Sequence, residues 1–246
     1  MRNLRRFLPV ITTAILFAGG LFAQPPEKEP IDQLIPWLLQ PAHEMREIPF
    51  PKVIASATGR RVLALDLKSE TDQRVITQIS AVLDEVMKRM NAPESAVQKV
   101  GRINEVSSHV ENVLRELLGA APGLSCDFPR TSEGRVQRSG YPDLRIVDTA
   151  SQRVFYLDPK LYAAGSRDSS FRTFYFEPKV ATNKVTDDAV HLIVGFEHAP
   201  KSGGRWNFTR WDLVDLAHFK VRLKAEFQGS NRDIYRPEAI VATSAR

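Results

Sequence analysis

The chain of 246 residues contains one cysteine, Cys126, and five histidines. A single thiol forms no disulfide within the chain and supplies no cysteine-based metal cluster. No glycine-rich phosphate-binding loop and no internal repeat occur. Disulfide-stapled folds, zinc clusters of cysteines and P-loop folds are therefore excluded. His191 and His198 could be metal ligands, but they stand seven residues apart on opposite faces of a predicted strand, which leaves structural or general-acid roles as the alternatives.

Long apolar runs are also scarce, and the N-terminus carries the one that stands out. Residues 7–22 are mostly apolar, follow three arginines and end before Ala23. This pattern is typical of a secretory signal peptide, and the run is short of the about 20 residues that a membrane span needs. We therefore predict a signal peptide at residues 1–23 and an exported protein, periplasmic or secreted. It would stay membrane-anchored only if the segment were not cleaved.

The charge balance is weakly basic overall but uneven along the chain. Residues 24–128 hold 12 Lys/Arg against 15 Asp/Glu, whereas residues 129–246 hold 19 against 14. A phosphate-binding surface would use the basic half. An ordinary solvated surface explains this asymmetry equally well, so charge alone does not decide the partner.

The spacing of apolar residues predicts helices first and strands afterwards. Helices are expected at residues 31–39, 71–90 and 94–118. Strands are expected at residues 61–67, 124–128, 171–176, 189–197 and 206–211, and residues 213–228 fit a strand better than a helix. The predicted fold is α/β, with a mixed central sheet flanked by helices. Residues 24–92 would form an N-terminal linker and helical extension, and residues 93–246 an α/β core with a C-terminal tail.

Residues 140–162 predict a β-hairpin that brings acids together. Apolar residues alternate in both strands, and the link 148–152 is rich in turn formers. A turn centred near Ala150 and Ser151 puts Asp143 opposite Asp158, with Cβ atoms about 4.5–5.5 Å apart. Lys160 shares their face. Two carboxylates that close repel each other unless a cation lies between them, and hard oxygen ligands suit Mg²⁺ or Mn²⁺.

Pro142-Asp143 followed by Asp158-Pro159-Lys160 resembles the signature of the PD-(D/E)XK nuclease superfamily, which has a restriction-endonuclease-like fold. The resemblance implies metal-dependent hydrolysis of phosphodiester bonds in nucleic acid, with DNA favoured. It makes Asp143 and Asp158 metal ligands. Lys160 would position and polarise the attacking water, or stabilise charge on the phosphate. Pro159 departs from a regular strand because proline donates no ladder bond, so the strand would bulge, end or lie at an edge there.

The superfamily commonly adds an acid from a helix that precedes the hairpin. Glu105 borders the apolar stripe of the predicted helix 94–118, with His109 one turn further on. We predict Glu105 as an auxiliary catalytic residue and metal ligand. Glu111 is the competing choice, but it lies further from the stripe.

Two other functions remain open from the sequence. The first is a non-catalytic exported binding module that keeps the nuclease-like fold. The second is a retaining glycoside hydrolase, whose two carboxyls lie about 5 Å apart; Lys160 beside the acids makes it the weaker alternative. Export would also conflict with a restriction role, which requires access to cytoplasmic DNA.

Overall fold

The computed structural model describes residues 30–39, 46–170 and 174–244, which belong to two units, residues 1–41 and 42–246. In the first unit, α1 (Pro30–Leu38) confirms the predicted helix 31–39, and none of its side chains is buried. The predicted signal peptide at residues 1–23 lies outside the described residues. Across the described ranges, none of the helices combines the length and hydropathy that a bilayer span requires.

The second unit is built on a mixed six-stranded sheet, which confirms the predicted fold class. Its strand order is β2-β6-β5-β4-β3, and β7 also pairs with β6. The pairs of β6 with β2 and β5 are parallel, and the remaining pairs are antiparallel. The strands are β2 (Val62–Leu63), β3 (Leu124–Asp127), β4 (Leu144–Asp148), β5 (Val154–Ala163), β6 (Ala189–Ser202) and β7 (Arg205–Asp215). A separate two-stranded sheet joins β1 (Ile48–Pro49) to β8 (Lys220–Val221).

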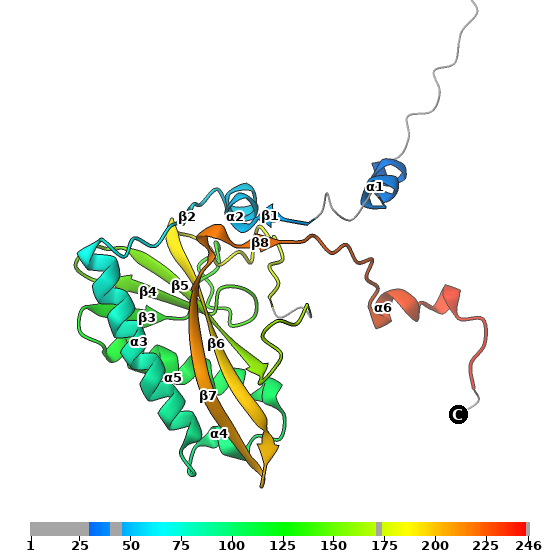
Figure 1. The fold of residues 1–246 in the computed structure, drawn as a ribbon. Helices are drawn as coiled ribbons and strands as arrows, with labels where there is room; N and C mark the ends of the chain where they lie inside the picture. Colours follow the sequence, from blue (N-terminus) through cyan, green and yellow to red (C-terminus); the bar gives the residue numbers. More distant parts are fainter. Residues whose placement is uncertain (1–29, 40–45, 171–173, 245–246) are drawn as a thin grey trace, which may run out of the picture. The chain divides into compact units, whose positions relative to one another are not determined.

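Two helices, α3 (Glu70–Asn91) and α5 (Ser107–Ala120), lie side by side over one face of the sheet (Figure 1). The α3 helix confirms the prediction at residues 71–90. Its buried stripe packs with that of α5 against Leu144, Ile146, Phe155 and Leu157 of the hairpin. Although we expected α3 to belong to an N-terminal extension, it thus contributes to the core of the second unit.

The predicted helix 94–118 is wrong, because the chain breaks into three pieces. These are α4 (Ala96–Lys99), the 3₁₀ helix η1 (Ile103–Glu105) and α5. Val100 and Arg102 are extended between them. The side chain of Gln98 donates hydrogen bonds to the Met90 and Trp206 carbonyls, and the Trp206 indole donates to the Val100 carbonyl. These tertiary bonds outweigh the helical periodicity of the segment.

An aromatic cluster covers part of the opposite face of the sheet. Its members are Phe50 and Ile54 from α2 (Phe50–Thr58), Tyr141, Tyr156, Phe174, Phe176 and neighbouring apolar residues. The predicted strand 171–176 is wrong in its described part, since residues 174–176 belong to no strand. The Phe174 and Phe176 rings instead meet the Phe50 ring edge-on, with centroids 5.4 and 6.2 Å apart.

The C-terminal prediction also needs correction. Residues 213–228 form no single strand: β7 ends at Asp215, and η2 (Leu216–His218) and β8 follow. The Asp215 side chain accepts hydrogen bonds from the Leu65 and Ala217 amides, which turns the chain at this point. The short α6 (Asn231–Ile234) and η3 (Pro237–Ala239) lie in the predicted tail. The remaining strands differ in length, since β2 is shorter than predicted and β6 continues to Ser202.

Candidate active site

The hairpin of β4 and β5 fixes which side chains share a face. Leu144 pairs with Leu157, so continuing the register by one residue places Asp143 opposite Asp158. The turn is held by Asp148, whose carboxylate accepts from the Ser151 amide and hydroxyl at 2.9 and 2.6 Å and pairs with Arg74 at 2.7 Å. A fixed turn fixes the register.

The structure brings together Asp143, Asp158 and Lys160 on the face that α3 and α5 do not cover. Asp158 is 2% exposed, and the ammonium of Lys160 forms an ion pair with its Oδ2 atom. Asp143 lies close enough for the charge of Asp158 to raise its pKa. The geometry matches the convergence that the sequence predicts, while the roles of the three groups stay predictions.

Pro159 is accommodated without a break in the strand. β5 runs through it, with Pro159 paired to Val194 of β6. The antiparallel partner β4 begins only at Leu144, opposite Leu157, so β5 has a strand on one side alone at Pro159. The proline therefore lies at a local edge, where it costs no ladder hydrogen bond on the open side.

The surroundings of the acid pair shift the protonation of Asp143 and of Lys160. Burial first, and then the charge of Asp158, raise the pKa of Asp143 to about 8, with Lys160 opposing and Glu111 adding to the rise. Burial disfavours the charged form of Lys160, but Asp158 and Asp143 outweigh it and raise the pKa of this lysine. At neutral pH the site thus holds an extra proton on Asp143 and a firmly charged ammonium on Lys160.

This donor set fits a hard divalent cation that also binds substrate and water. Within the described ranges, no group of three or more His, Cys, Asp and Glu side chains could hold a metal ion by itself. Mg²⁺, however, is usually held by one or two carboxylates together with waters and substrate phosphates. Burial and the charge of Asp158 disfavour the ionised form of Asp143, and a bound cation would offset both effects.

Of the two helix acids that the sequence offers, the structure places Glu111 near the acid pair, while the auxiliary role of either acid stays a prediction. Glu105 is exposed at the end of η1, one residue before the buried Val106. Glu111 lies on the second turn of α5, where its charge acts on Asp143 and its carboxylate accepts from Arg138 at 2.7 Å. The break before η1 changes the helical phase that favoured Glu105.

His191 and His198 belong to packed clusters apart from these acids. His191 is buried, its Nδ1 lies 2.7 Å from the Tyr141 hydroxyl, and burial lowers its pKa to about 3. His198 is buried edge-on to the ring of Trp206. Both histidines are therefore parts of packed clusters, which fits the structural one of the roles that the sequence left open.

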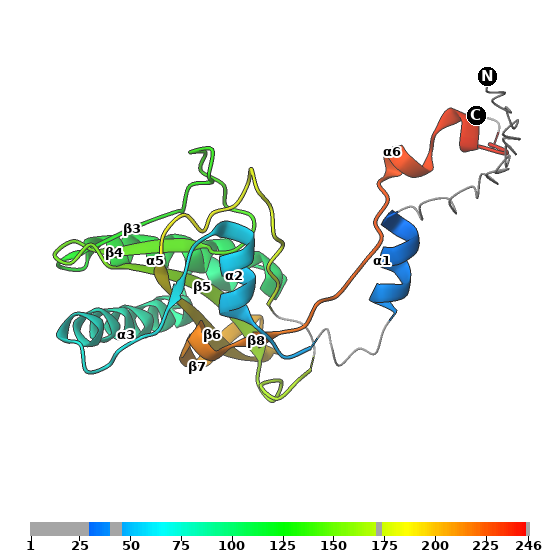
Figure 2. The same ribbon diagram turned by 90° about the horizontal axis from the view of Figure 1, so that it is seen from above.

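Two irregular segments stand beside the acids and lie side by side in Figure 2: residues 128–143 and residues 177–188. Ser132 joins them, since its amide donates to the Asn183 carbonyl and its hydroxyl to the Val180 and Ala181 carbonyls. A small hollow of about 150 Å³ opens between them, next to Tyr141.

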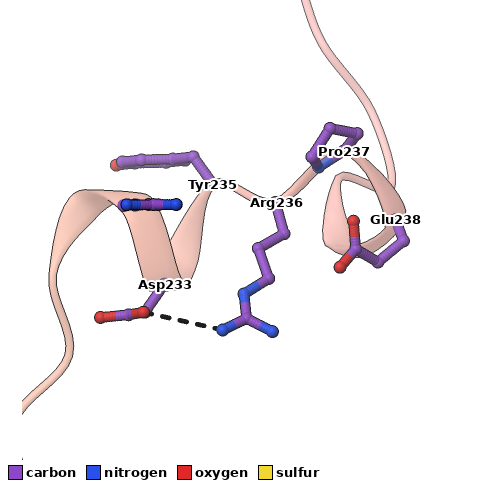
Figure 3. A pocket seen from close by; sticks show the side chains of 6 residues that line it. Asp233, Tyr235, Arg236, Pro237 and Glu238 are labelled. Atoms are coloured by element: carbon purple, nitrogen blue, oxygen red, sulfur yellow. Dashed lines mark ion pairs between the residues drawn. The ribbon is translucent and has the colours of Figure 1, made fainter.

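A larger hollow, of about 480 Å³, lies elsewhere and is lined by the C-terminal segment alone (Figure 3). There Arg236 and Asp233 form an ion pair at 3.6 Å. Every lining residue falls between Arg232 and Glu238, in an exposed part of the chain, and none belongs to the acid cluster. Although this hollow is larger, it is not the candidate active site, because it contains none of the acids or the lysine of the hairpin.

Comparison with known proteins assigns the chain to a family. Residues 42–238 match the family model of the type II restriction enzyme MjaV family. The chain belongs to this family. The type II restriction enzyme MjaV of Methanocaldococcus jannaschii is 28% identical over 223 residues, which cover 87% of this chain and 94% of the relative. The matched range begins where the second unit begins and includes the whole acid-bearing hairpin.

Asp143 gives a pH-dependent stability that can be measured with EDTA present. Its native pKa of about 8 lies above the unfolded value near 3.8, so the native state binds the extra proton between these pH values. The free energy of unfolding should therefore fall as pH rises from about 4 to 8. We expect Asp143→Asn to remove this loss and to raise the urea midpoint at pH 8 but not at pH 4.

The control is Asp188→Asn, because the amide and guanidinium of Arg61 lower the pKa of Asp188. That substitution should bring no gain at pH 8. Equal effects of Asp143→Asn at both pH values would contradict the raised pKa.

Proposed function

We propose that this protein is a metal-dependent endonuclease that hydrolyses phosphodiester bonds of DNA through a PD-(D/E)XK site. The observation that carries the proposal is the meeting of Asp143, Asp158 and Lys160 on one sheet face. Family membership supports it, since the curated relative is named a type II restriction enzyme. A cation held by Asp143 and Asp158, Mg²⁺ or Mn²⁺, would polarise the phosphate and lower the pKa of a bound water.

Lys160 acts in this proposal as a fixed positive charge. Its side chain is 29% exposed, so the ammonium borders solvent while it pairs with the buried Asp158. The two neighbouring acids raise its pKa, which keeps it protonated at neutral pH. A protonated lysine cannot accept a proton from water. Lys160 therefore stabilises the negative charge that develops on the phosphate.

The sheet face that continues from Lys160 suits the DNA backbone. Lys160 lies beside Gly195 of β6, which in turn lies beside Asp212 of β7. Arg210 and Arg167 both pair with Asp212, at 2.7 and 3.4 Å, and about half of each arginine side chain is exposed. Basic side chains along an open face supply the sequence-independent phosphate contacts that DNA binding needs.

Cleavage of DNA tests the proposal. With Mg²⁺ or Mn²⁺ the purified protein should nick or cut duplex DNA, and EDTA should stop the reaction. Asp158→Ala should lower the rate by about 10³-fold or more, because it removes a cation ligand and the partner of Lys160. Asp188→Asn removes an acid that lies outside the cluster and should leave the rate within about twofold.

Activity that survives in Asp158→Ala would refute the proposed site. Chelator-insensitive cleavage of a glycoside would favour the hydrolase alternative. Salt-sensitive DNA binding without cleavage under either metal would favour the binding module.

Glu111 and Glu105 form a matched pair of variants. Glu111→Gln should lower kcat by about 10–100-fold. This is the effect expected for a group that acts on the metal ligands Asp143 and Asp158 without itself binding the metal. Glu105→Gln should change kcat little, because the exposed Glu105 has no contact with the pair. Single-turnover rates at saturating Mg²⁺ measure both. The reverse ranking would restore the sequence prediction for Glu105.

We also propose that residues 1–23 direct export, on the strength of their basic start and apolar run. The family match begins at residue 42, beyond this segment. N-terminal sequencing of protein from fractionated cells of the source organism should find a mature chain that starts near Gln24 outside the cytoplasm. A cytoplasmic chain that retains Met1–Ala23 would contradict export.

A further inference from the structure

A second lysine, Lys184, is buried next to the acid pair. Its side chain comes from the irregular connection between β5 and β6, and the residue is 1% exposed. Its ammonium lies 3.4 Å from the Arg138 carbonyl, which is a long hydrogen bond. Lysine is almost never fully buried unless opposite charge compensates it. The compensation must therefore come from the surrounding groups.

Those groups are the acids of the proposed site. Asp143, Asp158 and Glu111 all act on the charge of Lys184: burial lowers its pKa and the three carboxyls oppose that shift. Arg138, which receives the Lys184 hydrogen bond on its carbonyl, pairs through its guanidinium with Glu111. Lys184 therefore lies among the carboxyls of Asp143, Asp158 and Glu111, of which Asp158 pairs with Lys160 and Glu111 with Arg138.

The chain on both sides of Lys184 is firmly anchored. The Asn183 side chain both accepts from the Val185 amide and donates to the Val185 carbonyl, at 3.0 and 3.1 Å. Asp187 binds Arg145 with two hydrogen bonds of 2.8 Å and accepts from the Tyr156 hydroxyl at 2.7 Å.

Arg145 stands two residues after Asp143 in the sequence, and Tyr156 two residues before Asp158. The Lys184 segment is therefore fastened to the same hairpin face one strand repeat away from the acids. Such anchoring holds a buried ammonium in one place.

We propose that Lys184 sets the metal affinity of the site, because its ammonium offsets negative charge of the acid cluster before a cation binds. The inference rests on the proposed function. It has a direct consequence for metal affinity, because Lys184 repels a divalent cation that Asp143 and Asp158 attract. Loss of the lysine would leave the cluster more negative and the free protein with a higher affinity for metal.

Lys184→Met tests this, since methionine keeps an unbranched side chain without the charge. Mn²⁺ is titrated into the DNA-free protein, and free Mn²⁺ is followed by electron paramagnetic resonance. The expected result is a Kd about tenfold lower in the variant, the order expected for one neighbouring charge near the protein surface. A lysine that only supported the structure would give the opposite result, because looser acids bind metal more weakly.

Lys179→Met is the matched control. It removes the same charge from the same connection, but Lys179 is exposed and pairs with Glu177, so its Kd for Mn²⁺ should equal that of the parent. Circular dichroism melting confirms that each variant is folded. Lys184→Gln, which keeps a polar group that can donate to the Arg138 carbonyl, carries the same expectation if Lys184→Met does not fold.

An unchanged or weaker Mn²⁺ affinity in a folded Lys184 variant would overturn the inference while leaving the proposed function intact. A parent protein that binds no Mn²⁺, or binds it as well after Asp158→Ala, would overturn the proposed function and this inference together.

Discussion

The antiparallel register of β4 against β5 is the constraint on which the candidate active site depends. It sets Asp143 opposite Asp158, an arrangement that like charges oppose. The same register places Leu144 and Leu157 in the core under α3 and α5. Burying each such side chain contributes about 1.5–3 kcal/mol. A shift by one residue would move the leucines to the open face and the acids into the core, so the hydrophobic core holds the acids in place.

Around this pair the charges come from segments far apart in the sequence. Asp143 and Asp158 belong to the hairpin, Glu111 to α5, and Lys184 to the connection between β5 and β6. Arg138 comes from the loop before the hairpin and pairs with Glu111. Positive and negative groups therefore face each other inside a partly buried site, where each unpaired charge would be costly. This mutual neutralisation explains how one face of the sheet tolerates so many ionised groups.

The sequence predicts the parts of the site that depend on local pattern. Alternating apolar residues and a turn-rich link were enough to place Asp143, Asp158 and Lys160 together. To place Glu111 beside the pair from the sequence, one would have to know where α5 begins. The hydrogen bonds between Gln98 and Trp206 interrupt the predicted helix before that point.

No local sequence pattern predicts the position of Lys184, because an irregular connection has no periodic spacing of apolar residues. Its position follows from long-range bonds such as Asp187 to Arg145.

The predicted strand at 171–176 is wrong in its described part because tertiary packing outweighs the local pattern. Phe174 and Phe176 pack in an aromatic cluster instead of pairing with a strand. The acid cluster affects Asp143 and Lys160 differently: Asp143 holds a proton up to about pH 8, whereas Lys160, which pairs with Asp158, stays positive. A cation bound at the proposed site would have to displace the proton of Asp143, so its binding would depend on pH, while the positive charge of Lys160 would not.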